Sequence, residues 1–249
     1  MINTYNESDL HATLKKIYAL EYKGKTEVSI GNWICDIETE DKSIIEIQTK
    51  NVSKLTPKVD DLLKQGRKVT VVHPLLEKKT IETYAADGSL LLRRQSPRQE
   101  SIYSLPRELT GIYPLLTRTG FTLEVLFIHA TELRQKADGP VQLTNRSRRF
   151  LKDWLPKGKR LDTILEKRRF SSLQDYKDLI PAALAEPFTI PRLTKAITAL
   201  PDIAKLNKSS RSYAEKQARL LIWLFSHMHI LEECGKEGRS RLYKFCPGI

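Results

Sequence analysis

Cysteine is scarce in this chain of 249 residues, which contains three: Cys35, Cys234 and Cys246. An odd number of widely spaced cysteines suits neither a disulfide framework nor a zinc site. We therefore expect a protein of the reducing cytoplasm. Cys35 lies inside an apolar run and is expected to be a small buried side chain.

Long apolar runs are also missing. The longest, LLIWLFSHMHIL at residues 220–231, contains two histidines and is too short to span a bilayer. The first residues, MINTYNESDLHATLKK, lack the apolar segment of a secretory signal. The sequence therefore predicts neither a membrane-spanning helix nor a leader, and we expect no membrane partner.

Acidic residues are few relative to basic ones, 30 against 42, which leaves a net charge of +12. Such an excess favours phosphate polymers or anionic surfaces as partners. A charge that only keeps the protein in solution is the alternative. The content of 40% hydrophobic and 29% charged residues is that of an ordinary globular protein.

Apolar periodicity predicts an N-terminal domain of α/β or α+β class over residues 1–135. An Asp87-Gly88 pair between alternating segments predicts a hairpin turn. The expected helices end near Gly24 and at Gly66, and the expected strands lie within residues 26–40, 42–50, 67–75 and 120–134.

The composition changes after residue 135. The stretch KADGPVQ resembles a linker, and residues 136–170, rich in lysine and arginine, are expected to form a basic connecting segment. Residues 171–249 are expected to be a second, mainly helical domain. It ends with a long helix and two strands joined by GKEGRS.

The candidate metal-binding residues are acids that lie in strand-like runs. Alternation along IIEIQTK projects Glu46, Gln48 and Lys50 from one face, and Asp36 lies on the preceding strand. If these strands pair, Asp36 and Glu46 approach each other and repel unless a cation lies between them. Mg²⁺ or Mn²⁺ suits such oxygen ligands and also binds phosphate.

This arrangement predicts hydrolysis of a phosphodiester. Gln48 would orient the attacking water, and Lys50 would stabilise the developing negative charge. The alternative is that Asp36 and Glu46 are solvent-facing residues of an edge hairpin.

At these positions the chain resembles the PD-(D/E)XK nucleases, the restriction endonuclease-like superfamily. The match is Asp36 followed by Glu46-Ile47-Gln48, with glutamine where the pattern usually has lysine. The resemblance implies a core of helix, mixed sheet and second helix, in which the Asp and the Glu bind the metal.

The likeness extends to the competence-associated (CoiA-like) branch through SDLHATLKK, TEV, ICDI and IIEIQTKNVSKL. It implies that His11, Lys15 and Glu27 also lie near the site. An exposed helix face is the alternative for His11 and Lys15. Glu21 is a further candidate carboxylate from the same helix.

The C-terminal part resembles a winged-helix domain in the order of its elements. TIPRLTKAI and AEKQARLLIWLFSHMHIL would be helices of the bundle, and EECGKEGRSRLYKF the wing. Such domains bind DNA or other proteins. The candidate DNA-binding residues are Arg146, Arg148, Arg149, Lys157, Lys159 and Arg160 in the basic segment and Lys236, Arg239 and Arg241 in the wing.

Together these features predict a Mg²⁺-dependent DNA endonuclease with a C-terminal DNA-binding domain. Cleavage of both strands would often need a homodimer. Two alternatives stay open: a catalytically inactive, nuclease-like DNA-binding regulator, and a protein–protein adaptor.

Overall fold

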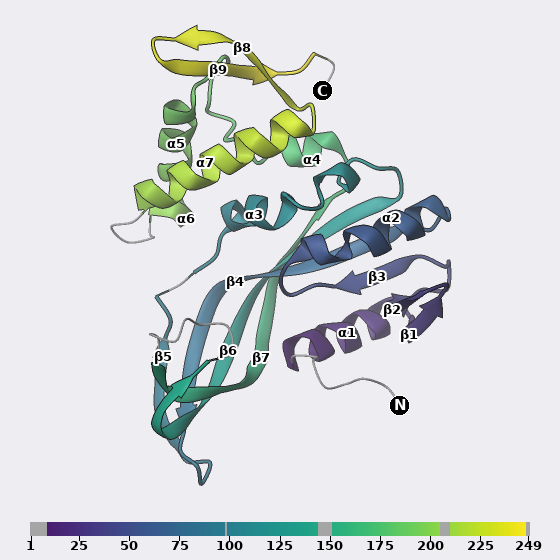
Figure 1. The fold of residues 1–249 in the computed structure, drawn as a ribbon, viewed down its shortest axis with the longest axis vertical. Coiled ribbons are helices and arrows are strands. Elements are labelled where there is room, and N and C mark those ends of the chain that lie inside the picture. The colour runs from purple at the N-terminus through teal and green to yellow at the C-terminus, as the bar shows by residue number, and fades with distance from the viewer. Residues whose placement is uncertain (1–8, 98, 144–150, 205–209, 248–249) are drawn as a thin grey trace.

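The computed structural model of the chain describes residues 9–97, 99–143, 151–204 and 210–247 (Figure 1). The elements of the first 170 residues are α1 (Asp9–Glu21), β1 (Lys25–Ile30), β2 (Trp33–Glu38), β3 (Ile44–Ile47), the 3-10 helix η2 (Val52–Leu55), α2 (Thr56–Lys64), β4 (Val69–Tyr84), β5 (Leu90–Gln95), η3 (Ile102–Ser104), α3 (Leu105–Leu109), η4 (Tyr113–Leu115), β6 (Phe121–Gln142) and β7 (Leu151–Phe170). They are followed by α4 (Leu173–Lys177), α5 (Ile190–Thr198), α6 (Pro201–Ala204), α7 (Ser210–His227), β8 (Leu231–Glu237) and β9 (Ser240–Phe245).

One mixed sheet organises the N-terminal part. Its strand order is β1-β2-β3-β4-β6-β7, and β5 pairs with β4. Strands β3, β4 and β6 are parallel to one another, whereas the pairings β1–β2, β2–β3, β4–β5 and β6–β7 are antiparallel. The prediction of a mixed α/β fold with a mixed central sheet is confirmed. The finer restriction endonuclease-like and winged-helix-like assignments stay predictions.

Helices cover both faces of this sheet where β1–β4 lie (Figure 1). Leu10, Leu14 and Tyr18, spaced by one helical turn, bury one stripe of α1 against the sheet. On β3 the alternation of side chains directs Ile45 towards α1 and Ile44 towards the core on the α2 side. Both helices are therefore fixed by packing on β3 and its neighbours.

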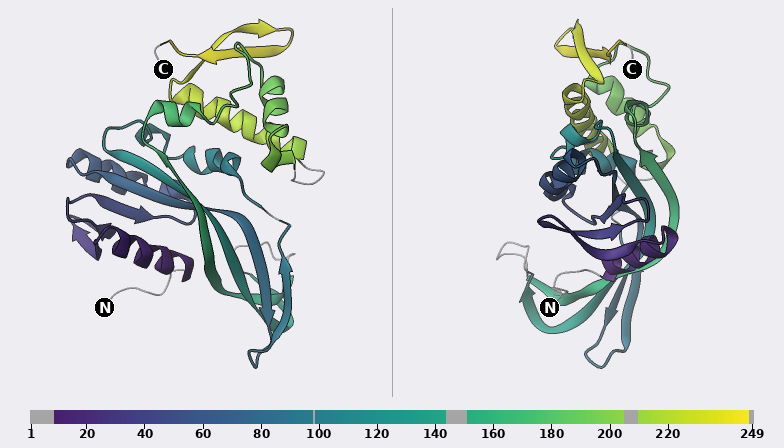
Figure 2. Two further views of the ribbon diagram at one scale, coloured as in Figure 1. Left: turned by 180° about the vertical axis from the view of Figure 1, so that it is seen from behind. Right: turned by 90° about the vertical axis from the view of Figure 1, so that its right-hand side faces the viewer.

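Strands β4, β6 and β7 continue far beyond this core and, with β5, form a curved arm (Figures 1 and 2). The expected connecting segment, residues 136–170, is therefore not a linker. Within the described residues it forms the end of β6 and all of β7, which pair over most of their length. The charged residues of β7 are compatible with a strand because most of its side chains are exposed.

The C-terminal helices pack directly on the N-terminal part. Tyr213 of α7 contacts Ser104 through their hydroxyl groups, 2.9 Å apart. The buried cluster on the α2 side continues without a break through α3 into α5 and α7. The expected late helices and terminal hairpin are present as α5, α7 and β8–β9. The hairpin turn at Asp87-Gly88 is present, with Gly88 at a φ of +84°.

Cys35 is fully buried, as expected, and none of the three cysteines forms a disulfide. Over the described ranges, no helix is both long enough and apolar enough to cross a membrane.

Candidate functional site

Three carboxylates lie at one level across β1, β2 and β3. Glu27 lies between Thr26 and Val28, which pair with Ile37 and Cys35 of β2, so Glu27 is opposite Asp36. The register of β2 with β3 pairs Ile37 with Ile45 and Glu38 with Ile44, so that Asp36 and Glu46 are the next residues beyond the last pair. The pairing of two strands thus brings together the two carboxylates that the sequence predicted.

Asp36 and Glu46 are held by each other's strands. The backbone N–H of Ile47 donates to Asp36 Oδ2 over 2.8 Å. The backbone N–H of Asp36 donates to Glu46 Oε1 over 3.2 Å. Each carboxylate is therefore fixed by the backbone next to the other, and the two groups lie close together where β2 and β3 separate.

Basic side chains from both helices surround these acids. From α1, His11 Nε2 lies 3.3 Å from Asp36 Oδ2, and Lys15 pairs with Glu27 and lies 4.0 Å from Asp36 Oδ1. From α2, on the other face of the sheet, Lys58 Nζ lies 2.6 Å from Glu46 Oε2. We call His11, Lys15, Glu27, Asp36, Glu46 and Lys58 the carboxylate cluster.

Burial differs between the two central acids. The Glu46 side chain is 3% exposed, and burial raises its pKa, an effect increased by Asp36 and opposed by Lys58. Burial also acts to raise the pKa of Asp36, but the hydrogen bond and charge of His11, the hydrogen bond from the Ile47 N–H and the charge of Lys58 together lower it. Asp36 is 18% exposed. It is thus the more accessible and more readily ionised of the pair.

Lys58 was missed by the sequence analysis. It lies in the first turn of α2, and its ammonium also donates to the Ile34 carbonyl over 2.7 Å. The signal was its spacing: Lys58 precedes the buried Leu62 by four residues and so lies on the apolar face of its helix. A lysine on that face needs a buried partner, which is Glu46.

His11 and Lys15 do not lie on a free helix surface, the alternative considered for them. Both face the acids of the carboxylate cluster. Glu21 lies elsewhere, 2.6 Å from Lys167 of β7. It is not part of the carboxylate cluster.

Gln48 and Lys50 follow Glu46 but are not directed at it. The Gln48 amide donates to the carbonyls of Lys50 and Asn51, and Lys50 is exposed. The roles predicted for these two side chains stay predictions, because each would have to turn towards the carboxylates.

The candidate DNA-binding residues fall on three segments. Arg146, Arg148 and Arg149 lie outside the described residues. Lys157, Lys159 and Arg160 lie on β7, and the exposed residues Lys236, Arg239 and Arg241 lie on the β8–β9 hairpin.

The β7 cations approach the carboxylate cluster from the arm. Gly158, between Lys157 and Lys159, lies against the Asp9 side chain at the start of α1. Burial lowers the pKa of Lys159, and the charges of Lys50 and Lys79 lower it further. The charges of Glu132 and Glu100 act in the opposite direction, and Lys79 is paired with Glu132 over 2.8 Å. Lysines from the segment after β3, from β4 and from β7 therefore lie near one another, with these acids beside them.

The donor set of the carboxylate cluster fits a hard divalent cation. Mg²⁺ is commonly bound by one or two carboxylates and keeps several waters or binds phosphate. Asp36 and Glu46 supply such a pair, and Asp36 is the more exposed of the two. Within the described ranges, no group of three or more His, Cys, Asp or Glu side chains is arranged as a complete protein metal site. A metal held by these two carboxylates would have to take its remaining ligands from water or substrate.

His73 of β4 supports the end of β3 and makes folding sensitive to pH. Its ring is 4% exposed, with Nδ1 2.7 Å from the Gln48 carbonyl. Burial lowers the pKa of His73, and the bond to Gln48 offsets this in part. Above about pH 6.5, His73 is neutral in both states and its contribution to stability is fully present. As the pH falls below that value, His73 is protonated in the unfolded chain before it is protonated in the folded one, and this contribution to stability is lost.

We expect acidification from pH 7.5 to 5.5 to destabilise the wild type more than His73→Asn, by up to about 1 kcal/mol. Asn is chosen because its amide can still donate to Gln48. Urea unfolding of both proteins at the two pH values measures the difference. An equal loss in both would show that His73 does not contribute to the pH dependence.

Comparisons with known proteins place the chain in a family. No solved structure matches it. A Treponema pallidum (strain Nichols) protein, described as an uncharacterized protein, is 31% identical over 133 residues, which are 53% of this chain and 52% of that relative. The chain thus spans about half the length of this relative. One family matches residues 8–171, a range that contains the whole carboxylate cluster and the strands of the large sheet. The chain belongs to this family, described as a domain of unknown function (DUF8091).

Proposed function

We propose that this protein is a DNA endonuclease that hydrolyses phosphodiester bonds with the help of Mg²⁺ or Mn²⁺. The observation that carries the proposal is the convergence of Asp36 and Glu46 from neighbouring strands, each bound to the other's backbone and flanked by His11, Lys15 and Lys58. Clusters of acids and cations with perturbed pKa values are frequent at catalytic sites.

The arrangement of elements supports this proposal. Helix α1, the strands β1–β3, helix α2 and the parallel strand β4 follow one another in the order that the restriction endonuclease-like resemblance implies. The carboxylates lie on the second and third strands of this series, as in that resemblance. The likeness in order adds to the side-chain geometry but does not replace it.

In this proposal Asp36 and Glu46 hold the divalent ion. When bound, such an ion polarises the phosphate and lowers the pKa of water. Lys58 neutralises the buried Glu46 and holds its carboxylate in place. Water adds to phosphorus, one P–O bond breaks, and the leaving oxygen takes a proton. His11 and Lys15 are the basic side chains nearest Asp36, and we assign proton delivery or charge stabilisation to them.

Two basic surfaces would hold the DNA. The first comprises Lys50, Lys79 and Lys159, of which Lys79 is paired with Glu132 over 2.8 Å; Gly158, next to Lys159, lies against Asp9 at the start of α1. The second is a hollow of about 1040 Å³ between α5, α7 and β9. The charged residues of this hollow are Lys195, Arg211, Arg219, Arg239 and Arg241, with Glu215 as its acid.

Charge balance in the C-terminal hollow favours a polyanion. Arg219 is paired with Glu215 over 2.7 Å, and Arg241 with Glu233 over 3.0 Å. In the part of the chain that the structure describes, Lys195, Arg211 and Arg239 have no carboxylate within ion-pair distance. Unpaired cations around a groove are suited to phosphate contacts. They also support DNA binding over the adaptor alternative.

The inactive regulator is the second candidate. Lys58 already neutralises Glu46, and Gln48 is turned away from the acids. Both observations are compatible with a nuclease-like scaffold that binds DNA without cutting it. Homodimer formation stays a prediction.

A plasmid assay tests the proposal. Purified protein is incubated with supercoiled plasmid and Mg²⁺ or Mn²⁺, with EDTA as the control. We expect nicked circles with either ion and none with EDTA. Binding without nicking would support the regulator instead.

The salt dependence of binding separates both DNA-binding candidates from the adaptor. In gel shifts with duplex DNA, affinity is expected to fall at least tenfold between about 50 and 200 mM salt, because several phosphate contacts release counterions. Absence of any DNA retention at the lower salt concentration would favour the adaptor.

A further inference from the structure

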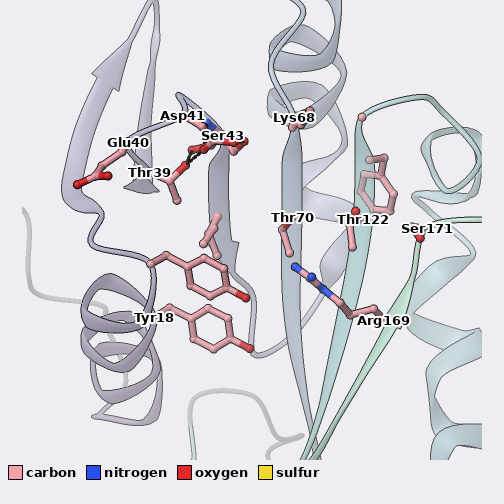
Figure 3. A pocket seen from close by; sticks show the side chains of 14 residues that line it. Tyr18, Thr39, Glu40, Asp41, Ser43, Lys68, Thr70, Thr122, Arg169 and Ser171 are labelled. Carbon is pink, nitrogen blue, oxygen red and sulfur yellow. Dashed lines mark hydrogen bonds between the residues drawn. The ribbon is translucent and has the colours of Figure 1, made fainter.

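A separate hollow lies on the α1 side of the sheet, near the C-terminal end of that helix. It has a volume of about 650 Å³. Its walls come from α1, the turn between β2 and β3, and the starts of β4 and β6 (Figure 3). Tyr18, which lines it, is seven residues after His11, about 10 Å along the helix axis. We call it the tyrosine pocket, and it is distinct from the carboxylate cluster.

A buried acid holds an arginine in the tyrosine pocket. Glu124 of β6 is 2% exposed and accepts a hydrogen bond from the Tyr18 hydroxyl. Arg169 Nε, on the neighbouring strand, lies 2.8 Å from Glu124 Oε2. Glu124 is the ion-pair partner of Arg169 among the described residues, and the guanidinium extends into the pocket (Figure 3). An arginine anchored through Nε presents two donors in a fixed orientation, which suits a phosphate.

Hydroxyl groups lie beside this arginine. Thr70 of β4 and Thr122 of β6 are direct neighbours in the sheet, and both line the pocket, as does Ser171 (Figure 3). The two threonines are half-buried, and neither hydroxyl has a hydrogen-bond partner in the described ranges. Lys68, two residues before Thr70, adds a second positive charge at the edge. Together they supply neutral and charged donors for one anionic group.

The remaining walls suit a flat ring with polar edges. Tyr22 stacks on Tyr18, with ring centroids 5.8 Å apart and planes within 8° of parallel. Tyr22 is half-buried and lines the pocket. Glu40 and Asp41, in the β2–β3 turn, are exposed acids that can accept hydrogen bonds from amino or hydroxyl groups. Parallel aromatic surfaces favour a planar heterocycle.

We propose that the tyrosine pocket binds a nucleoside monophosphate. The phosphate lies on Arg169 and the hydroxyls of Thr70 and Thr122, and the base packs against Tyr22. The volume lies within the range of small-molecule sites, roughly 300–1,000 Å³. The site needs neither a divalent ion nor DNA, so it stands apart from the proposed endonuclease activity.

Isothermal titration calorimetry on the full chain tests this site, with AMP and CMP as probes and adenosine and inorganic phosphate as comparisons. We expect at least one nucleotide to bind, and to bind at least tenfold more tightly than adenosine or phosphate alone. The double variant Thr70→Val/Thr122→Val is expected to weaken that binding at least tenfold. Valine matches threonine in shape and is favoured in strands, so the sheet is retained.

One control and one further binding-site variant make the test specific. Thr163→Val, an exposed threonine of β7, should leave nucleotide binding unchanged. Arg169→Lys retains a cation for Glu124 but loses the two terminal nitrogens of the guanidinium that would bind the phosphate. It should therefore also weaken binding at least tenfold. Plasmid nicking by the double threonine variant should equal that of wild type, so failure of this site and of the proposed nuclease are distinguishable.

The proposal is overturned by any of four results. The first would be that neither nucleotide binds at about 1 mM, and the second that the threonine double variant binds as wild type does. The third would be that adenosine binds as tightly as AMP, which would mean that the phosphate is not recognised. The fourth would be that phosphate alone binds as tightly as AMP, which would mean that the base is not recognised. A tenfold change corresponds to about 1.4 kcal/mol, well within calorimetric resolution.

Discussion

Replacing Asp36 by Asn is expected to reduce Mg²⁺-dependent plasmid nicking by about 100-fold or more. Asparagine keeps the size of the side chain and can still accept the hydrogen bond from the Ile47 N–H. It removes the negative charge that would bind the divalent ion, and a hundredfold loss corresponds to about 2.7 kcal/mol of transition-state stabilisation. The initial rate of plasmid nicking at saturating Mg²⁺ measures the effect.

Asp178→Asn is the matched control, because Asp178 is an exposed acid at the end of α4 in the C-terminal part. It should nick at the wild-type rate. DNA binding by Asp36→Asn should equal or exceed that of wild type, since a negative charge has been removed from the site. Nicking by Asp36→Asn at the wild-type rate would contradict the proposed role of Asp36.

Replacing Lys58 by Met is expected to lower the free energy of unfolding by about 3 kcal/mol. The Lys58 ammonium lies 2.6 Å from Glu46, whose side chain is 3% exposed. Removing one partner of a buried ion pair leaves the other charge without compensation, which typically costs about 3–5 kcal/mol. For a chain of this size the melting temperature should fall by roughly 6–12 °C. Urea unfolding and thermal melts at pH 8 measure the loss.

A second lysine of the same helix provides the control. Lys64 pairs with Asp60 over 2.7 Å, but its side chain is 66% exposed. Lys64→Met should therefore change stability by less than about 1 kcal/mol. The double variant Glu46→Gln/Lys58→Met should recover most of the loss, because neither charge is left alone. If Lys58→Met were no less stable than Lys64→Met, the pair would not be a buried interaction in solution.

Local patterns were sufficient for most of the N-terminal elements. The apolar spacing of Leu10, Leu14 and Tyr18 determines a helix, and the run Ile44-Ile45 with Ile47 determines a buried strand. The opposition of Asp36 and Glu46 also followed from alternation on two neighbouring strands. These features depend on contacts between residues close in sequence, which a periodic pattern records.

For residues 136–170, the prediction from local sequence composition was wrong. Their charge and glycine content resembled a linker, yet β6 and β7 pair along most of this region. A strand exposed on most positions carries no apolar alternation, so its sequence does not differ from that of a solvated segment. The backbone hydrogen bonds of β7 are made with its partner strand β6, and the sequence of β7 does not show which strand that partner is.

What the sequence alone determined is thus the pair of acids, the strands that carry them and the excess of positive charge. The tertiary structure decided which cations meet those acids and which polar side chains share a pocket. Lys58 reaches Glu46 because α2 packs on the opposite face of the sheet from α1, and Arg169 reaches Glu124 because β7 pairs with β6. Both contacts join residues from different elements, and the positions of those elements follow from the packing of the whole core around the sheet.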